Sequence, residues 1–309
     1  MSDLSIVVVA YGALDHLRRC LEGIDGAAAE IIVVDNGSGE LSTVPLRASW
    51  PSVRFIESGG NRGFGAGANL GLRASSGELV LLLNGDAWPA EGGLEALLAS
   101  ARKHPFGGIF GPRIVSPEGA PQRSVFAAPG GALALGLWAA APHAVSWVYG
   151  MVQRFRERAG RSGPPNADDV EISRPDEYVQ GAVLLLRRAA LGAIGGFDES
   201  FFMFSEEADV CRRVRRAGWT VHYVPTATFV HVGGASTALE PQRMYRALLV
   251  SHLRLLEKEY GTATAERARR MLVAALTVRS LRPSRRGRSR RTAAWLRTTP
   301  LAELLRQDA

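Results

Sequence analysis

An unbroken apolar run, Leu79 to Leu83, ends abruptly at Asn84-Gly85-Asp86, and this boundary constrains the fold more than any other part of the sequence. A short run of this kind is typical of a strand that is buried on both faces, as in a parallel sheet. Open α/β sheets bind their ligands just beyond the carboxyl ends of such strands. Asp86 is therefore a candidate ligand-binding carboxylate, although a turn that simply requires Asn, Gly and Asp explains the segment equally well.

Composition indicates a globular chain with one large domain or a domain with an appendage, since 46% of the 309 residues are hydrophobic and 22% are charged. Cys20 and Cys211 are the only cysteines. We therefore expect no disulfide framework and no cysteine-ligated zinc, and a reducing compartment is a good fit. The N-terminal residues MSDLSIVVVAYG lack the basic and apolar regions of a signal peptide, which predicts a cytoplasmic protein. Pro142 and His143 interrupt an apolar stretch over residues 130–150, and each uninterrupted piece is too short to span a membrane. We therefore expect core packing there, with a lipid-facing surface as the alternative.

The net charge of +7 is concentrated in one segment. Residues 279–297 contain eight arginines and no acidic residue, and subtracting these eight from +7 leaves the rest of the chain at −1. Such a segment predicts an anionic partner, either membrane lipid or nucleic acid, while a solvated, disordered end is an equally simple interpretation. Interleaved aromatic residues and a recognisable nucleic-acid-binding module are lacking, so we expect no nucleic acid partner.

Strands and helices alternate through the first half of the chain, which predicts a parallel sheet covered by helices. Strands are expected at Leu4–Ala10, Glu30–Val34, Val53–Ile56 and Leu79–Leu83, with helices at His16–Ile24 and Phe64–Ser75. The second half should contain strands at Tyr178–Arg187 and Trp219–Val224, a helix at Glu206–Ala217, a helical pattern over Pro241–Val278 and a basic appendage beyond Leu281. We expect Pro225 to halt the last strand, because proline cannot donate to a sheet.

Small or polar residues follow three of the predicted strands directly. They are Ala10-Tyr11-Gly12, Asp35-Asn36-Gly37-Ser38 and Asn84-Gly85-Asp86. Because parallel strands end at the same edge of a sheet, we expect these clusters to converge. A glycine-rich segment from Asn61 to Asn69 joins them; its glycines allow close backbone approach to a ligand, and Arg62 could neutralise a phosphate. Its GxGxxG-like spacing follows the third strand instead of the first, which disfavours a dinucleotide-binding fold.

Seven segments span about residues 4–235: IVVVAYG, IIVVDNGS, NRGFGAGAN, LLLNGDA, VQGAVLLLRR, GGFDESFFMFSEEADVCRRVRRAGW and HVGG. They occur in the order found in inverting family 2 glycosyltransferases, and the chain resembles the rhamnosyltransferase-like bacterial branch of that family. The resemblance implies an α/β GT-A fold with a mostly parallel central sheet and helices on both faces. It implies a nucleotide-sugar-binding half over residues 1–112 and an acceptor-binding, catalytic half over 113–240, followed by C-terminal helices (241–278) and a basic tail (279–309).

The resemblance also implies a divalent metal ion, Mg²⁺ or Mn²⁺. Such an ion would stabilise the negative charge that develops on the diphosphate leaving group of a sugar nucleotide. Hard cations favour oxygen ligands, and Asp86 would supply one. In the family, Asp86 corresponds to an aspartate of a short acidic motif, and the aspartate that usually leads this motif is replaced by Asn84 here. His231 corresponds to a histidine that reaches the metal or the diphosphate in some relatives, although a histidine after a β-rich run is more often structural.

Further residues are assigned to the nucleotide-sugar donor by the same resemblance. Asp35 would hydrogen-bond the base or ribose, and Ala10 and Tyr11 would frame the base. The remaining members of the predicted donor-binding set are Asn61, Arg62, Asn69, Asn84 and Asp86.

An inverting transfer needs a base that takes the proton of the acceptor hydroxyl. The family's Glu-Asp-x-Asp motif corresponds to Glu206–Asp209, so Glu207 is the predicted base, with Glu replacing the usual Asp and lengthening the side chain by one methylene. Asp209 is the alternative base. Glu206, Gln180 and Gly181 are expected to bind the acceptor. Acidic residues in the first turn of a helix also have a simpler explanation, because they complement the helix dipole.

The sequence thus predicts a metal-dependent inverting glycosyltransferase, with dTDP-rhamnose as the preferred donor and a cell-envelope, lipid-linked or polysaccharide acceptor. A UDP-hexose or UDP-galactofuranose donor is the alternative within this class, and a non-catalytic nucleotide-sugar-binding protein is the alternative outside it. The arginine-rich tail, helped by Trp295 and Leu296 at the headgroup boundary, would attach the protein peripherally to the inner face of the cell membrane.

Overall fold

The computed structural model describes residues 3–38, 44–127, 170–172, 174, 176–234, 240–281 and 286–306. The chain divides into two compact units, the first comprising Met1–Phe126 and Pro165–Pro241 and the second comprising Ala127–Pro164 and Gln242–Ala309. The apolar stretch over residues 130–150 lies outside the described residues. Within the described ranges, no helix is both long and apolar enough to cross a bilayer. The predicted halves 1–112 and 113–240 stay a prediction, and the division into units assigns residues 127–164 of the second half to the second unit.

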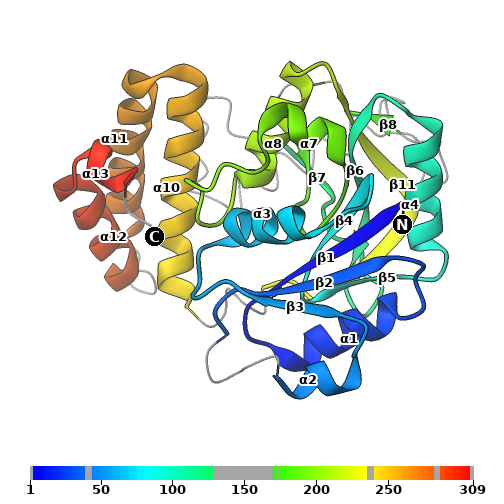
Figure 1. Cartoon of the computed structure of the whole chain (residues 1–309). Helices are drawn as coiled ribbons and strands as arrows, with labels where there is room; N and C mark the ends of the chain where they lie inside the picture. Colours follow the sequence, from blue (N-terminus) through cyan, green and yellow to red (C-terminus); the bar gives the residue numbers. More distant parts are fainter. Residues whose placement is uncertain are drawn as a thin grey trace. The chain divides into compact units, whose positions relative to one another are not determined.

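The first unit is built on a sheet of nine described strands in the order β3-β2-β1-β4-β10-β6-β11-β5, with β8 paired to β11 (Figure 1). The strands are β1 (Leu4–Ala10), β2 (Glu30–Asp35), β3 (Arg54–Glu57), β4 (Leu79–Asn84), β5 (Ala87–Pro89), β6 (Gly107–Val115), β8 (Val170–Glu171), β10 (Val183–Arg187) and β11 (Thr220–His231). A separate pair joins β7 (Val125–Ala127) to β9 (Glu177–Val179). The run β3-β2-β1-β4 is parallel throughout, as the alternation of strands and helices predicted. Beyond β4 the sheet is mixed, because β10 is antiparallel to both β4 and β6.

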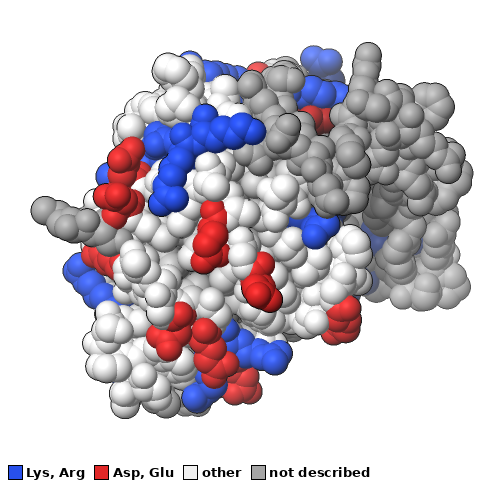
Figure 2. All heavy atoms as spheres, turned by 90° about the vertical axis from the view of Figure 1, so that its right-hand side faces the viewer, with Lys and Arg blue, Asp and Glu red and all other residues white. Residues whose placement is uncertain are grey.

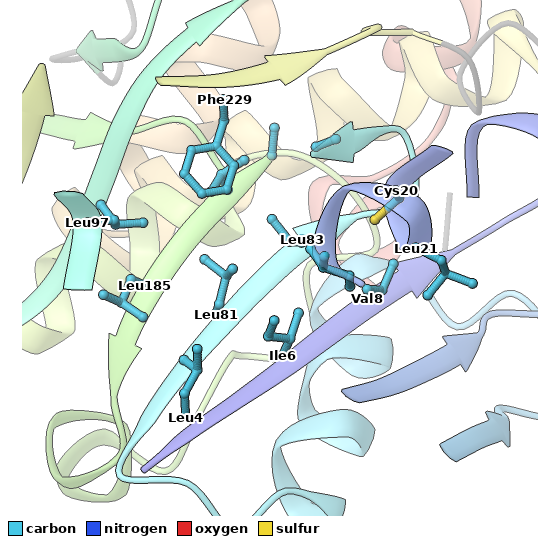
Figure 3. Packing of buried hydrophobic residues seen from close by; sticks show 14 of the residues in the cluster. Leu4, Ile6, Val8, Cys20, Leu21, Leu81, Leu83, Leu97, Leu185 and Phe229 are labelled. Atoms are coloured by element: carbon cyan, nitrogen blue, oxygen red, sulfur yellow. The ribbon is translucent and has the colours of Figure 1, made fainter. Parts of the chain in front are cut away.

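Alternate residues of the central strands enter two different cores, which confirms helices on both faces. In β1, Ile6 and Val8 point to one core and Val7 and Val9 to the other. The first core is covered by α1 (Leu14–Ile24) and α4 (Gly93–Lys103), and Figure 3 shows Cys20 and Leu21 of α1 beside the strand residues. The second is covered by α3 (Phe64–Ala74), α7 (Arg188–Ile194) and α8 (Glu206–Arg216), and α2 (Val44–Ser49) completes the unit's described helices. Each fully buried aliphatic side chain contributes about 1.5–3 kcal/mol.

Two predicted strand boundaries were wrong. The expected strand Tyr178–Arg187 is two strands, because residues 180–182 leave the β7–β9 pair and enter the main sheet. The expected stop at Pro225 does not occur, since β11 continues to His231. A register shift against β6 between Val224 and Thr228 accommodates the proline, as bulges commonly do. The extra length carries His231 to the edge of the sheet.

The second unit is helical where it is described. Its helices are α10 (Pro241–Tyr260), α11 (Thr262–Arg279), α12 (Arg286–Thr298) and α13 (Leu301–Leu304), so the predicted helical pattern breaks at Gly261. Ala293 and Leu296 of α12 share a buried core with Leu253 of α10 and Leu272 of α11.

The basic tail is therefore not a disordered appendage over its described residues. In α12 the buried positions follow helical spacing, and Leu296 is 0% exposed, so it cannot serve as the predicted anchor at the headgroup boundary. Trp295 is half-buried, with the guanidinium carbon of Arg246 4.8 Å from its ring centroid. The exposed side chains of the same helix include Arg288, Arg290, Arg291 and Arg297.

Candidate active site

The carboxyl ends of β1, β2 and β4 meet at one edge of the sheet. Ala10 lies beside Asp35 in the parallel register, and Val9 lies beside Asn84. The Asn36 N–H donates to the Ala10 carbonyl at 2.8 Å, and the Gly85 N–H donates to the Val9 carbonyl at 3.0 Å, so the loops continue the strand pairing. The three polar clusters converge as the sequence predicted.

Asp35 and Tyr11 are each held by a neighbouring loop. Asp35 is buried, and its carboxylate accepts a hydrogen bond from the Ser38 N–H at 2.8 Å. The Ser38 hydroxyl in turn accepts from the Gly12 N–H at 3.1 Å. Tyr11 is half-buried and donates its hydroxyl to Glu240 at 3.0 Å. Both side chains thus line the edge at which β1 and β2 end.

Asp86 and His231 are far apart in the sequence but come together at the same edge of the sheet. Residue pairing between β11 and β5 sets His231 opposite Ala87. As a result, His231 Nε2 lies 3.3 Å from Asp86 Oδ1 and 3.4 Å from Asn84 Nδ2. The Gln122 amide donates to the His231 carbonyl at 2.7 Å, which fixes the strand end.

The Asp86–His231 pair fits a divalent cation as a two-ligand site. Carboxylate oxygen and imidazole nitrogen are both good metal ligands, and here Asp86 Oδ1 and His231 Nε2 are 3.3 Å apart. His231 Nδ1 is buried without a hydrogen-bond partner among the described residues. The described ranges contain no cluster of three or more His, Cys, Asp or Glu side chains suited to a metal. Further ligands would therefore come from water or from the phosphates of a substrate, as is usual for Mg²⁺.

Asn36 fastens the glycine-rich loop to the end of β2, a role that sequence reasoning missed. Its side-chain amide donates to the Gly63 carbonyl at 3.0 Å, and its oxygen accepts from the Arg62 N–H at 3.3 Å. Gly37 permits this approach, because a Cβ there would lie 2.4 Å from the Asn61 nitrogen. The only sequence signal was a second polar residue after Asp35 in a turn cluster.

The same loop, and the helix α3 that follows it, are also tied to the segment that precedes α8. Gly63 has a φ of 84°, and a Cβ on it would lie 2.1 Å from the Phe202 carbonyl oxygen. Asn69 donates to the Phe197 carbonyl and to Glu199, and accepts from the Phe197 N–H, at distances of 2.9, 3.0 and 2.9 Å. Its amide is engaged on both atoms and ties α3 to the segment before α8, while the predicted contact of Asn69 with the donor stays a prediction. Arg62 is half-exposed, with its guanidinium 3.6 Å from Glu199.

Backbone strain marks the start of α8. Phe204 and Ser205 adopt the left-handed region, with φ of 70° and 67°. This costs about 1–2 kcal/mol for each non-glycine residue, and strain of this kind gathers at functional sites. The turn places Glu207 against the segment that precedes β10, since a Cβ on Gly181 would lie 3.4 Å from the Glu207 Cβ. The next residue, Ala182, accepts a hydrogen bond from the Asn84 N–H at 2.9 Å. Glu207 is thereby linked to the edge that carries Asp86.

The two glutamates of this motif are unusually basic. Burial, and then the charge of Glu207, raise the pKa of Glu206 well above its ordinary value. Burial raises the pKa of Glu207 to about 7. The Oε2 atom of each carboxylate is buried without a hydrogen-bond partner among the described residues, as is Oε1 of Gln180. For both carboxyls, burial therefore favours the protonated form.

Asp209 is placed differently from the glutamates. Its carboxylate is 1% exposed and accepts from Arg213 Nε at 2.7 Å. Arg213 also donates to the carbonyls of Ile194 and Gly196, at 2.9 and 2.7 Å, at the end of α7. Because the Asp209 carboxylate is fixed in this ion pair, its geometry favours a structural role over that of a proton acceptor.

Comparison with known proteins decides the family. Residues 5–127 match the family described as Glycosyl transferase family 2. An N-acetylglucosaminyl-diphospho-decaprenol L-rhamnosyltransferase of Mycobacterium tuberculosis is 31% identical over 258 residues, which cover 78% of this chain and 80% of that protein. The chain belongs to glycosyltransferase family 2. The low-salt glycan biosynthesis hexosyltransferase Agl10 of Haloferax volcanii is 28% identical to this glycosyltransferase over 237 residues, covering 75% of the chain and 67% of the relative.

Solved structures confirm the GT-A fold of this glycosyltransferase. A mannosyltransferase from Pyrobaculum calidifontis, in complex with GDP-Man and Mn²⁺, aligns with a TM-score of 0.53 at 16% identity, covering 97% of this chain and 82% of that chain. GalNAc-T7 with UDP, GalNAc and Mn²⁺ aligns with a TM-score of 0.57 at 14% identity, covering 82% of this chain and 47% of that chain.

Replacing Gly63 with alanine should separate the glycine-rich loop from the segment before α8. Gly63→Ala and Gly59→Ala both place alanine at a positive φ, which costs about 1–2 kcal/mol in each. Only the Gly63 variant also forces a Cβ into the Phe202 carbonyl, since no atom lies within 4 Å of the Gly59 position. We expect Gly63→Ala to lose glycosyl transfer and Gly59→Ala to keep it, in transfer assays paired with thermal unfolding. Equal activity of the two variants would show that the loop contact has no functional role.

Proposed function

We propose that this glycosyltransferase moves rhamnose from dTDP-rhamnose to a sugar on a lipid diphosphate, with inversion at the anomeric carbon and with a divalent metal. The observation that carries the proposal is the position of Glu207 beside the strand end that presents Asp86 and His231, with its Oε2 buried and without a hydrogen-bond partner among the described residues. Similarity to the mycobacterial rhamnosyltransferase supports the choice of sugar and acceptor. The hexosyltransferase relative makes a different hexose the alternative donor.

The donor would bind across the carboxyl ends of β1, β2 and β4. Asp35 is suited to hydrogen-bond the base or ribose, with Ala10 and Tyr11 beside the base. Asp86 and His231 would hold Mg²⁺ or Mn²⁺, an assignment supported by the 3.3 Å between Asp86 Oδ1 and His231 Nε2. The ion would neutralise negative charge on the departing nucleoside diphosphate.

Glu207 would act as the general base. Its carboxylate takes the proton of the acceptor hydroxyl, the hydroxyl oxygen bonds to the anomeric carbon, and the bond from that carbon to the diphosphate breaks. A pKa of about 7 suits this task, because a base works best when its pKa lies near the operating pH. Glu206 and Gln180, with unpartnered buried oxygens, could accept hydrogen bonds from further hydroxyls of the acceptor.

Transfer should depend on Asp86 and on a divalent metal. We expect the purified enzyme to move rhamnose from dTDP-rhamnose to an alkyl diphospho-N-acetylglucosamine, to stop in EDTA and to recover with Mn²⁺. Asp86→Ala should lower turnover about 100-fold or more, because a catalytic metal is worth several kcal/mol. Asp15→Ala, at an exposed position of α1, is the matched control. Full activity in EDTA, or in Asp86→Ala, would rule out this part of the proposal.

Glu207→Gln should reduce turnover by about 10²–10⁴-fold with little change in donor affinity, because the amide keeps the shape but cannot take a proton. Since the pKa of Glu207 in the folded protein is raised to about 7, the wild-type rate should increase as pH rises through 7. The variant should not show this increase. The same shift means that ionisation of Glu207 destabilises the fold as pH rises from 4.5, the ordinary pKa of a glutamate, towards 7. Glu207→Gln should therefore be the more stable protein at about pH 8.

Asp209→Asn provides the comparison for Glu207. It weakens the ion pair with Arg213, so we expect a lower melting temperature and a largely retained pH profile. If Asp209→Asn were stable but inactive while Glu207→Gln remained active, the base would be Asp209.

We further propose that the second unit attaches to an anionic membrane surface through α12. Arg288, Arg290, Arg291 and Arg297 are exposed on a helix that has no acidic residue. On the face of the molecule in Figure 2, by contrast, both signs of charge are interspersed. With Leu296 buried, the apolar contact would come from Val278 and Leu281, which are 64% and 78% exposed.

Vesicle binding tests this surface. Replacing Arg288, Arg290 and Arg291 with glutamine should weaken co-sedimentation with phosphatidylglycerol vesicles about 100-fold at low salt, since each arginine contributes about 1 kcal/mol near an anionic leaflet. Point changes are preferable to truncation, because removing α12 would expose the core of the second unit. The control replaces Arg18, Arg102 and Lys103 of the first unit, all exposed. Equal pelleting of both triple variants and wild type would contradict the proposal.

A further inference from the structure

Three planar side chains stack in succession on the β7–β9 pair. The guanidinium carbon of Arg123 lies 4.5 Å from the ring centroid of Phe126. Phe126 stacks on Tyr178 with centroids 5.7 Å apart and an interplanar angle of 19°. Arg123 is exposed, and its Nε donates to the Val125 carbonyl at 3.0 Å, so the charged group is held in one orientation at the surface.

The inner end of this stack reaches the proposed base. Cys211 of α8 lies against the backbone of Val179, the residue after Tyr178. Burial, and then the charge of Glu207, raise the pKa of Tyr178. A Cβ on Gly181, three residues after Tyr178, would lie 3.4 Å from the Glu207 Cβ. The Gln180 N–H donates to the Ser124 carbonyl at 2.9 Å and joins the two edges of this wall. The exposed Arg123 is therefore connected, through its neighbour Ser124 and through Gln180, to the backbone that lies beside Glu207.

The chemistry of the stack favours a phosphate ligand. A guanidinium presents a planar fork of N–H donors that matches phosphate, and an aromatic face beneath it reduces the freedom lost on binding. The donor's diphosphate already has partners proposed for it at the ends of β4 and β11. An acceptor whose hydroxyl meets Glu207 and which carries its own diphosphate would extend along the β7–β9 wall instead.

We propose that Arg123, positioned by Phe126 and Tyr178, binds the diphosphate of the acceptor and selects sugar diphosphates over uncharged sugars. This inference rests on the proposed function for the class of acceptor. It adds a residue outside the family motifs and gives the β7–β9 pair a role in recognition. Phe126 is a positioning residue, because it acts through Arg123.

Two acceptors separate charge recognition from sugar recognition: an alkyl diphospho-N-acetylglucosamine and the matching alkyl N-acetylglucosaminide without phosphate. Arg123→Gln should raise the KM and Kd for the diphosphate acceptor about 10- to 100-fold, the range for a lost hydrogen bond to a charged group. The values for the uncharged acceptor and for dTDP-rhamnose should stay unchanged. Arg102→Gln, an exposed arginine on α4, is the matched control and should alter none of them.

Phe126→Leu keeps the charge but removes the stacking partner. We expect a smaller loss, confined to the diphosphate acceptor, with Arg123→Lys behaving similarly because lysine lacks the planar fork. Phe106→Leu is the control, since Phe106 is 74% exposed and lies outside the stack. Thermal unfolding of every variant shows whether the fold is retained.

Direct binding keeps the inference separate from the proposed function. If wild type binds the diphosphate probe in calorimetry but transfers no rhamnose to it, the proposed function fails and the inference stands. Equal binding of the probe by wild type and Arg123→Gln would overturn the inference. So would an equal loss with both acceptors, which would mean that Arg123 supports the base, or a loss confined to dTDP-rhamnose, which would place Arg123 on the donor.

Discussion

The burial of β4 on both faces is the constraint on which the site depends. Its leucines alternate between two cores, and the strand is hydrogen-bonded to β1 on one side and β10 on the other. A strand held in this way cannot shift in register without moving apolar side chains out of both cores. Its end therefore delivers Asn84 and Asp86 to a fixed point, with the loop after β1 and the residues before β10 alongside.

The polar edge is costly for the fold, and the surrounding contacts hold it in place. Two carboxyls with raised pKa values, two left-handed residues and a buried imidazole nitrogen without a described partner lie close to this edge. Each opposes folding by an amount comparable to the gain from one buried aliphatic side chain. Asn36, Asn69 and Asp209 support the arrangement, because the side chain of each makes a hydrogen bond that holds a segment next to the site. Such tension between stability and geometry is expected where a protein must bind charged ligands.

The helical second unit shows how composition alone misleads. Eight arginines between residues 279 and 297 suggest a disordered tail. In α12, however, Ala293 and Leu296 recur at helical spacing and enter a shared core, while Arg288, Arg290, Arg291 and Arg297 are exposed. The helix is amphipathic, and its charged side chains lie on its exposed face.

The sequence by itself determined the type and order of the elements in the parallel half, the edge where their polar ends converge and the acidic motif that opens α8. Those features follow from periodicity and local turn chemistry, which act over a few residues. Only the tertiary structure decided that β11 passes Pro225 and brings His231 to Asp86, that Asn69 supports a loop and that Asp209 is bound to Arg213. The partners of Asn84 and Asn69 lie 147 and 128 residues away along the chain. The role of a polar side chain depends on such distant partners. Local sequence patterns specify each strand and helix, but only tertiary packing brings these partners together.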